Sequence, residues 1–295
     1  MIIGDIYGGL GNQMFQYAFY RALSKEINAP IKFCTSLIDN KNSHNGFELL
    51  EVFDIDLEIA SQKDIFDTVG FLPSFLIFRK FLRLMSSFGI NHSSLIFEPH
   101  YSFWNDYHRF AVDDIFYSGY WQTQKYFENY SNLIRKDFVF SKPMDSKNLE
   151  IALSIKESTS ISLHVRRGDY LSNRKTFTKH GICSLEYYEN SINFFLSKFP
   201  QARFFTFSDD VNWVRNFLLP KFDSIEVVDI NYGKYSYNDM RLMSLCNHHI
   251  ISNSTFSWWG AWLNESINKK VIAPKKWFAD GTDSSDLIPE DWLRL

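Results

Sequence analysis

Apolar positions recur with strand and helix periods along the chain, most regularly in its C-terminal half. Residues 161–165 read I-S-L-H-V, in which every second residue is apolar, as expected for a half-buried strand. Further strands are predicted over 203–207, 225–228, 248–252 and 271–273. Helices are predicted over 185–199, 211–219, 238–246 and 258–262. Repeated alternation of strand and helix predicts a parallel, doubly wound sheet.

The N-terminal half opens with a predicted strand over 2–7, a glycine-rich turn over 8–13 and a helix over 14–27. The helix is apolar almost all round, so we expect it to be largely buried. A strand over 30–33 follows. This order is typical of a nucleotide-binding unit, but the turn lacks the third glycine of G-x-G-x-x-G and the ending of a P-loop. Its glycines can instead let another molecule approach the backbone, with Asn12 and Gln13 as donors and acceptors.

A polar stretch with a proline, over 141–148, is the best candidate for a domain boundary. The 295 residues suffice for one large domain or two of ordinary size. We therefore predict an N-terminal domain over 1–145 and a C-terminal domain over 146–295.

The segment 71–85 has two interpretations. Apolar residues recur at helical spacing in it, with basic residues between them. It is too short and too charged to span a bilayer. A helix packed within the domain is the favoured interpretation, and a basic amphipathic helix on a membrane surface is the alternative.

Charge and cysteine content limit the class of protein. The net charge of −3 provides no general basic field, so nucleic acid is not an expected partner and any bound anion needs a local cluster of cations. Three cysteines without a C-x-x-C motif fit a reducing compartment. The N-terminus has no pattern of a secretory signal, so we expect a cytoplasmic protein.

No metal site is predicted. The sequence D-I-D at 54–56 is a D-x-D motif, which holds a metal in some sugar transferases, but a single D-x-D is frequent and is interpreted here as surface. His248 and His249 are adjacent within an apolar run and are interpreted as strand residues rather than zinc ligands.

Three predicted strand ends bring polar side chains to one edge of the C-terminal sheet. Two adjacent arginines after the first strand match an anion such as phosphate, although a solvated turn is the simpler interpretation. The second end can be an Asx turn and the third an N-cap. Together they predict a nucleotide or nucleotide-sugar site. The three groups are His164, Arg166, Arg167 and Asp169; Ser208, Asp209 and Asp210; and Asn253, Ser254, Thr255 and Ser257.

Five motifs in chain order carry a resemblance to a known family: 8–18, 119–122, 164–170, 207–210 and 251–264. The H-V-R-R-G-D-Y and N-S-T-F-S-W-W elements are the most specific of these. The chain resembles the bacterial α-1,2-fucosyltransferases, family eleven of the glycosyltransferases. The resemblance implies an α/β fold of GT-B type, with two Rossmann-like domains facing across a cleft. It also implies metal-independent, inverting transfer of L-fucose from GDP-β-L-fucose to the 2-hydroxyl of a terminal galactose on an O-antigen, capsule or similar glycan.

The same resemblance implies roles for individual residues. Arg166 would meet the β-phosphate of the donor, and Arg166, Asn12 and Asp169 are the candidate catalytic residues. The general base is not identified, and Asp5, Glu48 and Asp169 are candidates only as carboxylates. Residues implied on the donor side are His164, Arg166, Arg167, Asp169, Asp209, Asp210, Asn253, Ser254, Thr255, Phe256 and Ser257. Residues implied on the acceptor side are Gly9, Gly11, Asn12, Gln13, Tyr120, Trp121 and Gln122.

Expected partners are GDP-fucose and a galactose-terminated or lipid-linked glycan, with no cofactor and, as an alternative, a peripheral contact with the inner face of the membrane. Residues 34–110 match no motif, so acceptor choice is expected to lie there. Two other functions stay open: a transferase of the same fold that uses another GDP-sugar, and a protein that binds a nucleotide sugar without catalysis. Intact Arg166, Asp169 and S-T-F-S elements argue against the last, because decayed sites lose such costly residues.

Overall fold

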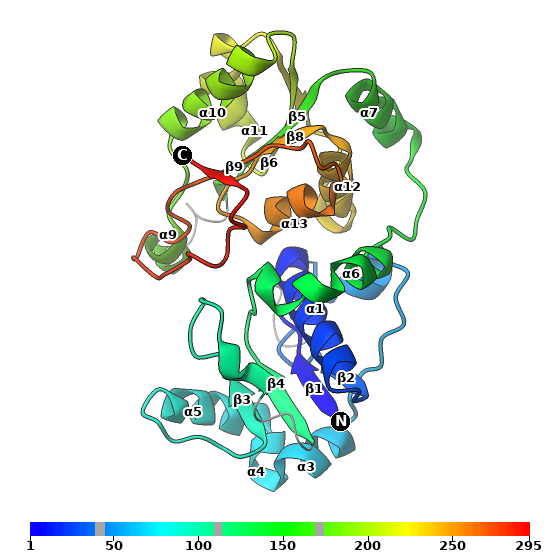
Figure 1. Cartoon of the computed structure of the whole chain (residues 1–295), viewed down its shortest axis with the longest axis vertical. Coiled ribbons are helices and arrows are strands. Elements are labelled where there is room, and N and C mark those ends of the chain that lie inside the picture. Colours follow the sequence, from blue (N-terminus) through cyan, green and yellow to red (C-terminus); the bar gives the residue numbers. More distant parts are fainter. Residues whose placement is uncertain (39–44, 109–113, 169–173) are drawn as a thin grey trace. The chain divides into compact units, whose positions relative to one another are not determined.

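The computed structural model describes residues 1–38, 45–108, 114–168 and 174–295, which form two compact units (Figure 1). Unit 1 comprises Met1–Ser141 and Ser285–Leu287, and unit 2 comprises Lys142–Ser284 and Ile288–Leu295. The predicted boundary after residue 145 lies a few residues beyond this division. Ser285–Leu287 joins unit 1 because Asp286 accepts hydrogen bonds there, from the Phe103 N–H at 2.8 Å and from Lys125 Nζ at 2.5 Å.

Four parallel strands form the sheet of unit 1, in the order β2-β1-β4-β3. The strands are β1 (Ile2–Asp5), β2 (Ile31–Cys34), β3 (Leu95–Phe97) and β4 (Ile115–Ser118). The predicted strands over 2–7 and 30–33 are confirmed. Strands β3 and β4 were not predicted, because apolar runs of three or four residues are too short to show a period.

Helix α1 (Leu10–Glu26) is the central helix of unit 1, and its predicted burial is confirmed. Twelve of its seventeen residues are buried, so every side of the helix is covered. It begins four residues earlier than predicted, because Gly9 takes an extended N-cap conformation and its carbonyl accepts from the Asn12 N–H at 2.9 Å. Gly4 allows β1 to lie close to α1, since a Cβ there would come within 2.3 Å of the Tyr20 ring.

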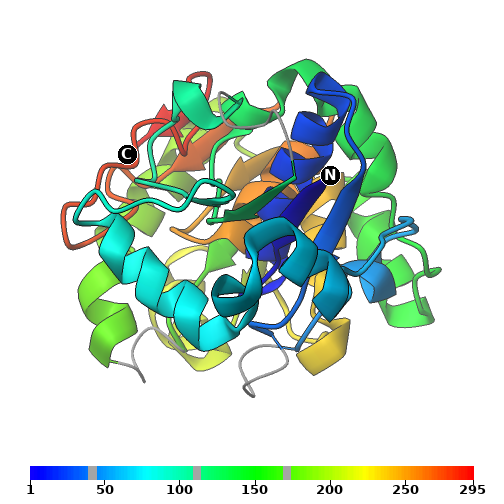
Figure 2. The same cartoon turned by 90° about the horizontal axis from the view of Figure 1, so that it is seen from below.

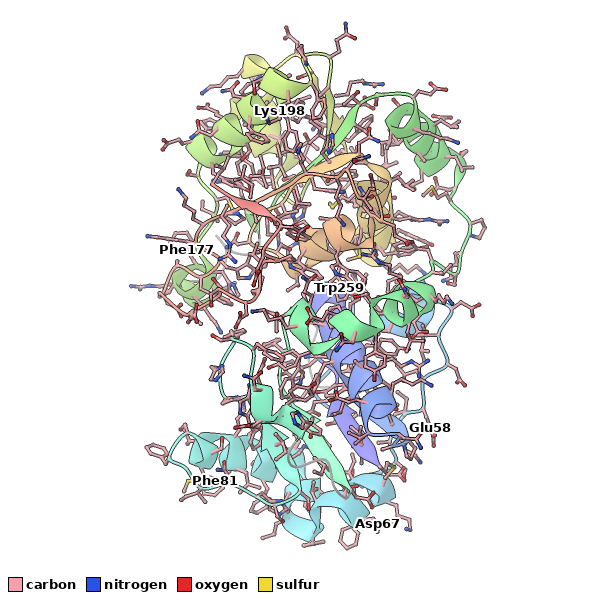
Figure 3. All side chains as sticks on the ribbon, in the orientation of Figure 1. Glu58, Asp67, Phe81, Phe177, Lys198 and Trp259 are labelled. Atoms are coloured by element: carbon pink, nitrogen blue, oxygen red, sulfur yellow. The ribbon has the colours of Figure 1, made fainter. Side chains whose placement is uncertain are left out.

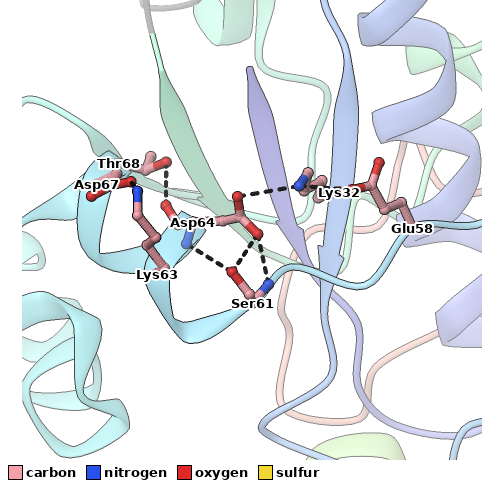
Figure 4. Close-up of polar contacts among 7 residues, drawn as sticks. All are labelled: Lys32, Glu58, Ser61, Lys63, Asp64, Asp67 and Thr68. Atoms are coloured by element: carbon pink, nitrogen blue, oxygen red, sulfur yellow. Dashed lines mark hydrogen bonds and ion pairs between the residues drawn. The ribbon is translucent and has the colours of Figure 1, made fainter.

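The remaining helices of unit 1 are short. They are α2 (Leu49–Val52), α3 (Gln62–Val69), α4 (Phe71–Ser74), α5 (Leu76–Ser86) and α6 (Ser131–Asp137), with 3₁₀ turns η1 (Asn105–His108), η2 (Gln124–Tyr126) and η3 (Glu128–Tyr130). A capping box starts α3, in which the Ser61 side chain accepts from the Asp64 N–H and Asp64 accepts from the Ser61 N–H (Figure 4). Lys32 on β2 pairs with Asp64 and with Glu58, which ties α3 to the sheet.

The segment predicted as one helix over 71–85 is two helices, separated by Phe75 in an extended conformation. The favoured interpretation, a packed helix, is only partly right. Leu82 packs against the buried cluster around Ile3, but Phe71 is 64% exposed and Phe75 is 46% exposed. None of the described helices is long and apolar enough to cross a membrane.

Unit 2 contains six parallel strands in the order β10-β9-β8-β5-β6-β7. The strands are β5 (Ser160–Val165), β6 (Arg203–Ser208), β7 (Ile225–Val228), β8 (His248–Ile250), β9 (Val271–Ala273) and β10 (Leu293–Arg294). Taken in chain order this is 3-2-1-4-5-6, the order of a Rossmann sheet. The five predicted strands are confirmed, and β10, with two residues, was not predicted.

Helices cover both faces of the unit 2 sheet, as can be followed in Figure 1. They are α7 (Ser146–Lys156), α9 (Arg174–His180), α10 (Leu185–Lys198), α11 (Val211–Phe217), α12 (Tyr237–Leu245) and α13 (Thr255–Leu263), with 3₁₀ turns η4 (Leu219–Lys221) and η5 (Gly233–Tyr235). Side chains of α10 and α11 pack with Ile161 and Leu163 of β5. Side chains of α7 and α12 pack with Phe205 and Phe207 of β6 on the other face. The fold is therefore the predicted mixed α/β fold with parallel sheets.

Strand β5 is buried along its whole length, so the prediction of a half-buried strand is wrong. Alternation misled here because the polar residues face a covered side of the sheet and satisfy each other. Ser162 Oγ lies 2.8 Å from Nδ1 of His249, and His164 Nδ1 lies 2.8 Å from Oγ of Ser252.

Candidate functional site

The strand order of unit 2 reverses between β5 and β8, and in such sheets ligands bind beyond the carboxyl ends of the strands at this switch point. β5 ends at Val165, directly before Arg166, and β8 ends at Ile250, shortly before Asn253. The first and third predicted groups therefore follow the two strands that flank the switch point. The second group follows β6, which is the other neighbour of β5.

His164 links the two strands at the switch point. Its hydrogen bond to Ser252 joins the end of β5 to the residues after β8. Burial, and to a smaller extent the Arg166 cation, lower the pKa of His164 to about 3. The imidazole is therefore neutral at neutral pH, and its ring packs 5.9 Å from that of Phe256 at the start of α13.

Arg166 and Arg167 are held by the two aspartates that follow β6. Arg166 Nε lies 3.2 Å from Oδ2 of Asp209, and both side chains are about one-quarter exposed. Asp209 also accepts a hydrogen bond from the Arg167 N–H at 2.8 Å. A Cβ at Gly168 would come within 3.2 Å of Asp209, so a glycine keeps the two loops close.

Arg167 packs more deeply than Arg166. Its guanidinium carbon lies 4.4 Å from the centre of the Trp213 ring, and its Nε lies 3.6 Å from Oδ2 of Asp210. Asp210 is also the N-cap of α11, where it accepts from the Trp213 N–H. Both aspartates thus orient arginines, and the predicted contact of either one with the base or ribose of GDP stays a prediction.

The third group begins α13, a nine-residue helix with buried tryptophans that include Trp259 (Figure 3). Ser254 is the N-cap, and its side chain makes no capping hydrogen bond. The first N–H groups of a helix lack partners within the helix and attract anions. Thr255 is half-buried in this first turn. The start of α13 therefore offers donors beside the loop that carries Arg166.

Two residues of the third group are used inside the protein. Asn253 is 2% exposed, and its amide donates to the carbonyls of His180 and Trp277 at 2.7 and 3.2 Å. Ser257 is 1% exposed, and its hydroxyl donates to the Ser254 carbonyl. These side chains shape the loop. Asp169, predicted for both catalysis and donor binding, lies outside the described residues.

The sheet of unit 1 has its own switch point, between β1 and β4. Gln122, after β4, donates to Oδ1 of Asn12 at 2.8 Å, in the first turn of α1. Gln16 joins the same two loops, since it accepts from the Tyr7 N–H at 2.9 Å and donates to the Gly119 carbonyl at 3.1 Å. The predicted motifs at 8–18 and 119–122 are thus in contact.

The other acceptor-side residues have mixed environments. Gly9 is partly exposed at the N-cap of α1, and Gly11 is buried in its first turn. Gln13 is fully buried, and its amide donates to the carbonyls of Gly8 and Gly46. Gln13 therefore holds the segment after residue 44 against α1 rather than presenting an amide to solvent.

Tyr120 and Trp121 differ strongly in exposure. Tyr120 is half-buried, with its ring 5.0 Å from that of Tyr7. Trp121 is fully buried, stacks on Phe19 at 4.1 Å and has a φ of 55°. Glu98 fixes this unusual backbone by accepting from the N–H groups of both residues. Trp121 is a core residue.

Two of the three carboxylates named as base candidates can be placed. Asp5 is 2% exposed at the end of β1, and burial raises its pKa despite the nearby Arg79 cation. Glu48 is 6% exposed, and burial raises its pKa although Asn45 donates to it. Both carboxylates are buried, so neither presents a base at the surface of unit 1.

Sequence reasoning missed several residues that position this site. Trp213 and Ser252 follow the ends of β6 and β8, and position at a strand end was the signal that could have found them. Glu98 follows β3, a strand that was itself not predicted. Gln16 lies within the 8–18 motif, which was the signal that could have found it, whereas nothing in the sequence marks Arg79 as a partner of a distant loop.

The D-x-D sequence at 54–56 and the adjacent histidines His248 and His249 are not part of the loops at the two switch points. Asp54 and Asp56 are exposed, which confirms their interpretation as surface, and His248 and His249 are strand residues as predicted. Within the described ranges, no group of three or more His, Cys, Asp or Glu residues is arranged to hold a metal ion.

Comparison with known proteins identifies the family. A family model described as "Glycosyl transferase family 11" matches residues 73–294. The chain is 33% identical to an alpha-1,2-colitosyltransferase of Escherichia coli, over 100% of this chain and 99% of that protein. It is 30% identical to the O-antigen biosynthesis glycosyltransferase WbnK of Escherichia coli, over 98% of each.

A solved structure supports the fold. The structure of FUT1 from Arabidopsis thaliana in complex with GDP superposes with a TM-score of 0.54 and 11% identity, over 92% of this chain and 70% of that chain. This likeness concerns the fold alone, which is of GT-B type as predicted. The family match and the full-length relatives show that the chain belongs to glycosyltransferase family 11.

Proposed function

We propose that this protein transfers L-fucose from GDP-β-L-fucose to the 2-hydroxyl of a terminal galactose on a glycan, with inversion and without a metal. The observation that carries the proposal is the switch point of the unit 2 sheet, where Arg166 follows β5 and α13 follows the neighbouring strand β8. The motifs shared with α-1,2-fucosyltransferases support the choice of donor. The relative that acts in O-antigen biosynthesis supports an O-antigen or similar glycan as acceptor.

The donor half of the proposal follows from charge. When fucose leaves, negative charge develops on the β-phosphate of GDP. A fixed guanidinium and the N–H groups of a helix start can stabilise this charge without reorganisation. The Asp209 carboxylate holds Arg166 at 3.2 Å, which fixes the guanidinium before the donor binds. Neutral His164 supplies no proton and instead ties the two loops together.

The acceptor half needs groups that recognise hydroxyls. The amides of Asn12 and Gln122 can donate to and accept from sugar hydroxyls, and Tyr120 offers a half-buried ring. Inversion requires the acceptor hydroxyl to attack from the face opposite to GDP. Since Asp5 and Glu48 are buried, we assign neither as base, and Asn12 is proposed to orient the hydroxyl in a dissociative transition state. The hydroxyl oxygen then bonds to the anomeric carbon as the bond to GDP breaks, and the hydroxyl proton passes to solvent water.

A second donor is favoured by one observation, the 33% identity with a colitosyltransferase over the whole chain. Colitose is L-fucose without its 3-hydroxyl, so GDP-colitose presents the same diphosphate to Arg166. A hydrogen bond from the protein to the 3-hydroxyl of fucose would make the site select GDP-fucose over GDP-colitose. A site that hydrogen-bonds a substrate hydroxyl strongly rejects the analogue that lacks this hydroxyl.

The deciding experiment measures GDP release from GDP-fucose, GDP-colitose and GDP-mannose in EDTA, with and without a β-galactoside. Release confined to GDP-fucose and stimulated by the galactoside is the expected result. Preference for GDP-colitose would establish the second donor instead. Tight GDP binding without turnover of any donor would favour a protein that binds nucleotide sugars without catalysis.

A further inference from the structure

Helix α5 of unit 1 carries an apolar stripe that faces solvent. Ile77, Phe81 and Leu84 lie on one side of the helix, and Phe88 continues the same spacing just after its end. Their exposed fractions are 74%, 55%, 59% and 74%. Helix α5 runs along the surface of unit 1 in both views, and Phe81 is labelled in Figure 3.

The opposite side of α5 is fixed to the sheet. Arg79 is 3% exposed, and its guanidinium donates to Oγ of Ser36 at 2.8 Å and to the Ser74 carbonyl at 3.2 Å. The same guanidinium lies 4.8 Å from the centre of the Phe116 ring. Because this buried arginine sets the rotation of the helix, the apolar stripe cannot turn into the core.

Helix α4 extends the apolar area. Phe71 and Phe75 are exposed, and their rings lie 5.3 Å apart. We call Phe71, Phe75, Ile77, Phe81, Leu84 and Phe88 the α4–α5 surface. Exposed apolar residues scattered singly need no explanation, but six large ones within eighteen residues mark an interaction site.

The charge around this surface selects its partner. Residues 68–97 contain no Asp or Glu, although the whole chain has a net charge of −3. Lys80 is exposed on α5 beside the stripe, whereas the guanidinium of Arg83 lies near Tyr7 and Glu98 of unit 1. Lys63 on α3, by contrast, is paired with Asp67 (Figure 4). The segment is therefore locally cationic and apolar, which complements an anionic lipid surface.

We propose that the α4–α5 surface docks the protein on an anionic bilayer, with α5 lying in the interface. The stripe enters the boundary of headgroups and acyl chains, while Lys80 reaches the anionic headgroups. A second copy of the chain is a poorer occupant, because a two-fold contact would bring the Lys80 side chains of both copies together. This proposal is independent of the identity of the donor and acceptor.

The test is sedimentation of the full chain with vesicles of phosphatidylcholine alone and of phosphatidylcholine mixed with phosphatidylglycerol. We expect binding to the anionic vesicles that falls as salt is raised. The variant I77S/F81S/L84S should bind them at least about tenfold more weakly. Ile267→Ser is the matched control, since Ile267 is 96% exposed in unit 2 and lies outside the surface.

Two further measurements keep the outcome clear. Lys80→Glu should weaken binding to anionic vesicles more than Ile267→Ser does, because Ile267→Ser removes one apolar side chain outside the surface. Thermal unfolding should show unchanged stability for all variants, because the altered side chains face solvent. Absence of vesicle binding, or equal binding by the triple variant, would overturn the proposal. So would a dimer in sedimentation velocity that the triple variant dissociates, which would assign the surface to a second copy.

Discussion

At the switch point of the unit 2 sheet the polar groups are charged, whereas at that of the unit 1 sheet they are mainly amides and phenols. Arg166 and Arg167 meet Asp209 and Asp210 in unit 2. Asn12 and Gln122 meet in unit 1, next to Tyr120. Both sheets are parallel and place their loops in the same topological position. The difference teaches that topology sets where a ligand binds, while the loop residues set which chemistry it has.

Charged groups suit a diphosphate leaving group, and neutral amides suit a sugar hydroxyl. Asp5 and the nearby Arg79 at the unit 1 switch point are buried and serve the core, and Glu98 holds the backbone of Tyr120 and Trp121. If this comparison holds, changes in unit 2 should alter chemistry and donor binding. Changes in unit 1 should alter acceptor binding.

The largest effect is expected from Arg166→Ala, which removes the guanidinium proposed to stabilise the departing GDP. We expect kcat for transfer to fall on the order of a hundredfold or more. Arg166→Lys should recover only part of the activity, because an ammonium lacks the planar fork. GDP release measures the effect, and Arg215→Ala is the control, since Arg215 pairs with Asp229 on the surface of unit 2. An unchanged kcat in Arg166→Ala would contradict the proposed role of Arg166 in stabilising the departing GDP.

A smaller effect is expected from Gln122→Ala in unit 1. The substitution removes the 2.8 Å hydrogen bond to Asn12, which is one of the contacts that orient the Asn12 amide. We expect KM for the acceptor to rise about fivefold to tenfold, the effect of one hydrogen bond, with GDP affinity unchanged. Gln201→Ala on the surface of unit 2 is the control. A loss of GDP affinity with unchanged acceptor KM would break the assignment of the two switch points.

His164 gives a prediction on pH and stability. Its folded pKa of about 3 lies below the ordinary value of 6.5, so between these values the unfolded chain binds a proton that the folded chain does not. The free energy of unfolding should therefore fall as pH is lowered through this window. Relative to His164→Gln, the free energy of unfolding of the wild-type protein should fall by about 1.4 kcal/mol for each pH unit by which the pH is lowered below about pH 6. Urea unfolding at several pH values measures this difference, and parallel curves would contradict a buried neutral imidazole.

The smallest effect is expected from chelation. If the guanidinium and the start of α13 stabilise the leaving diphosphate, the rate of transfer should change less than about twofold in EDTA. Added Mn²⁺ should not raise the rate above that of untreated protein. Loss of transfer in EDTA and its recovery with Mn²⁺ would show that a metal ion stabilises the negative charge of the leaving diphosphate instead.

The sequence determined five of the six described strands of unit 2 and the polar residues that follow them. Runs such as I-S-L-H-V and the helical stripes between them are local patterns, and local patterns fix local structure. The shared motifs also indicated the family, because specific residues at fixed spacing are distinctive of a family, whereas overall composition is not.

Only the tertiary structure decided which polar residues are available to a ligand. Asn253, Gln13 and Trp121 belong to the motifs, but packing turns their side chains inward. Arg79 and Ile77 show the converse, since the charged residue is buried and the apolar one is exposed. Helical periodicity gives the spacing of a stripe but not its direction. The direction depends on contacts between residues far apart in the sequence, such as Arg79 with Ser36, which no local pattern records.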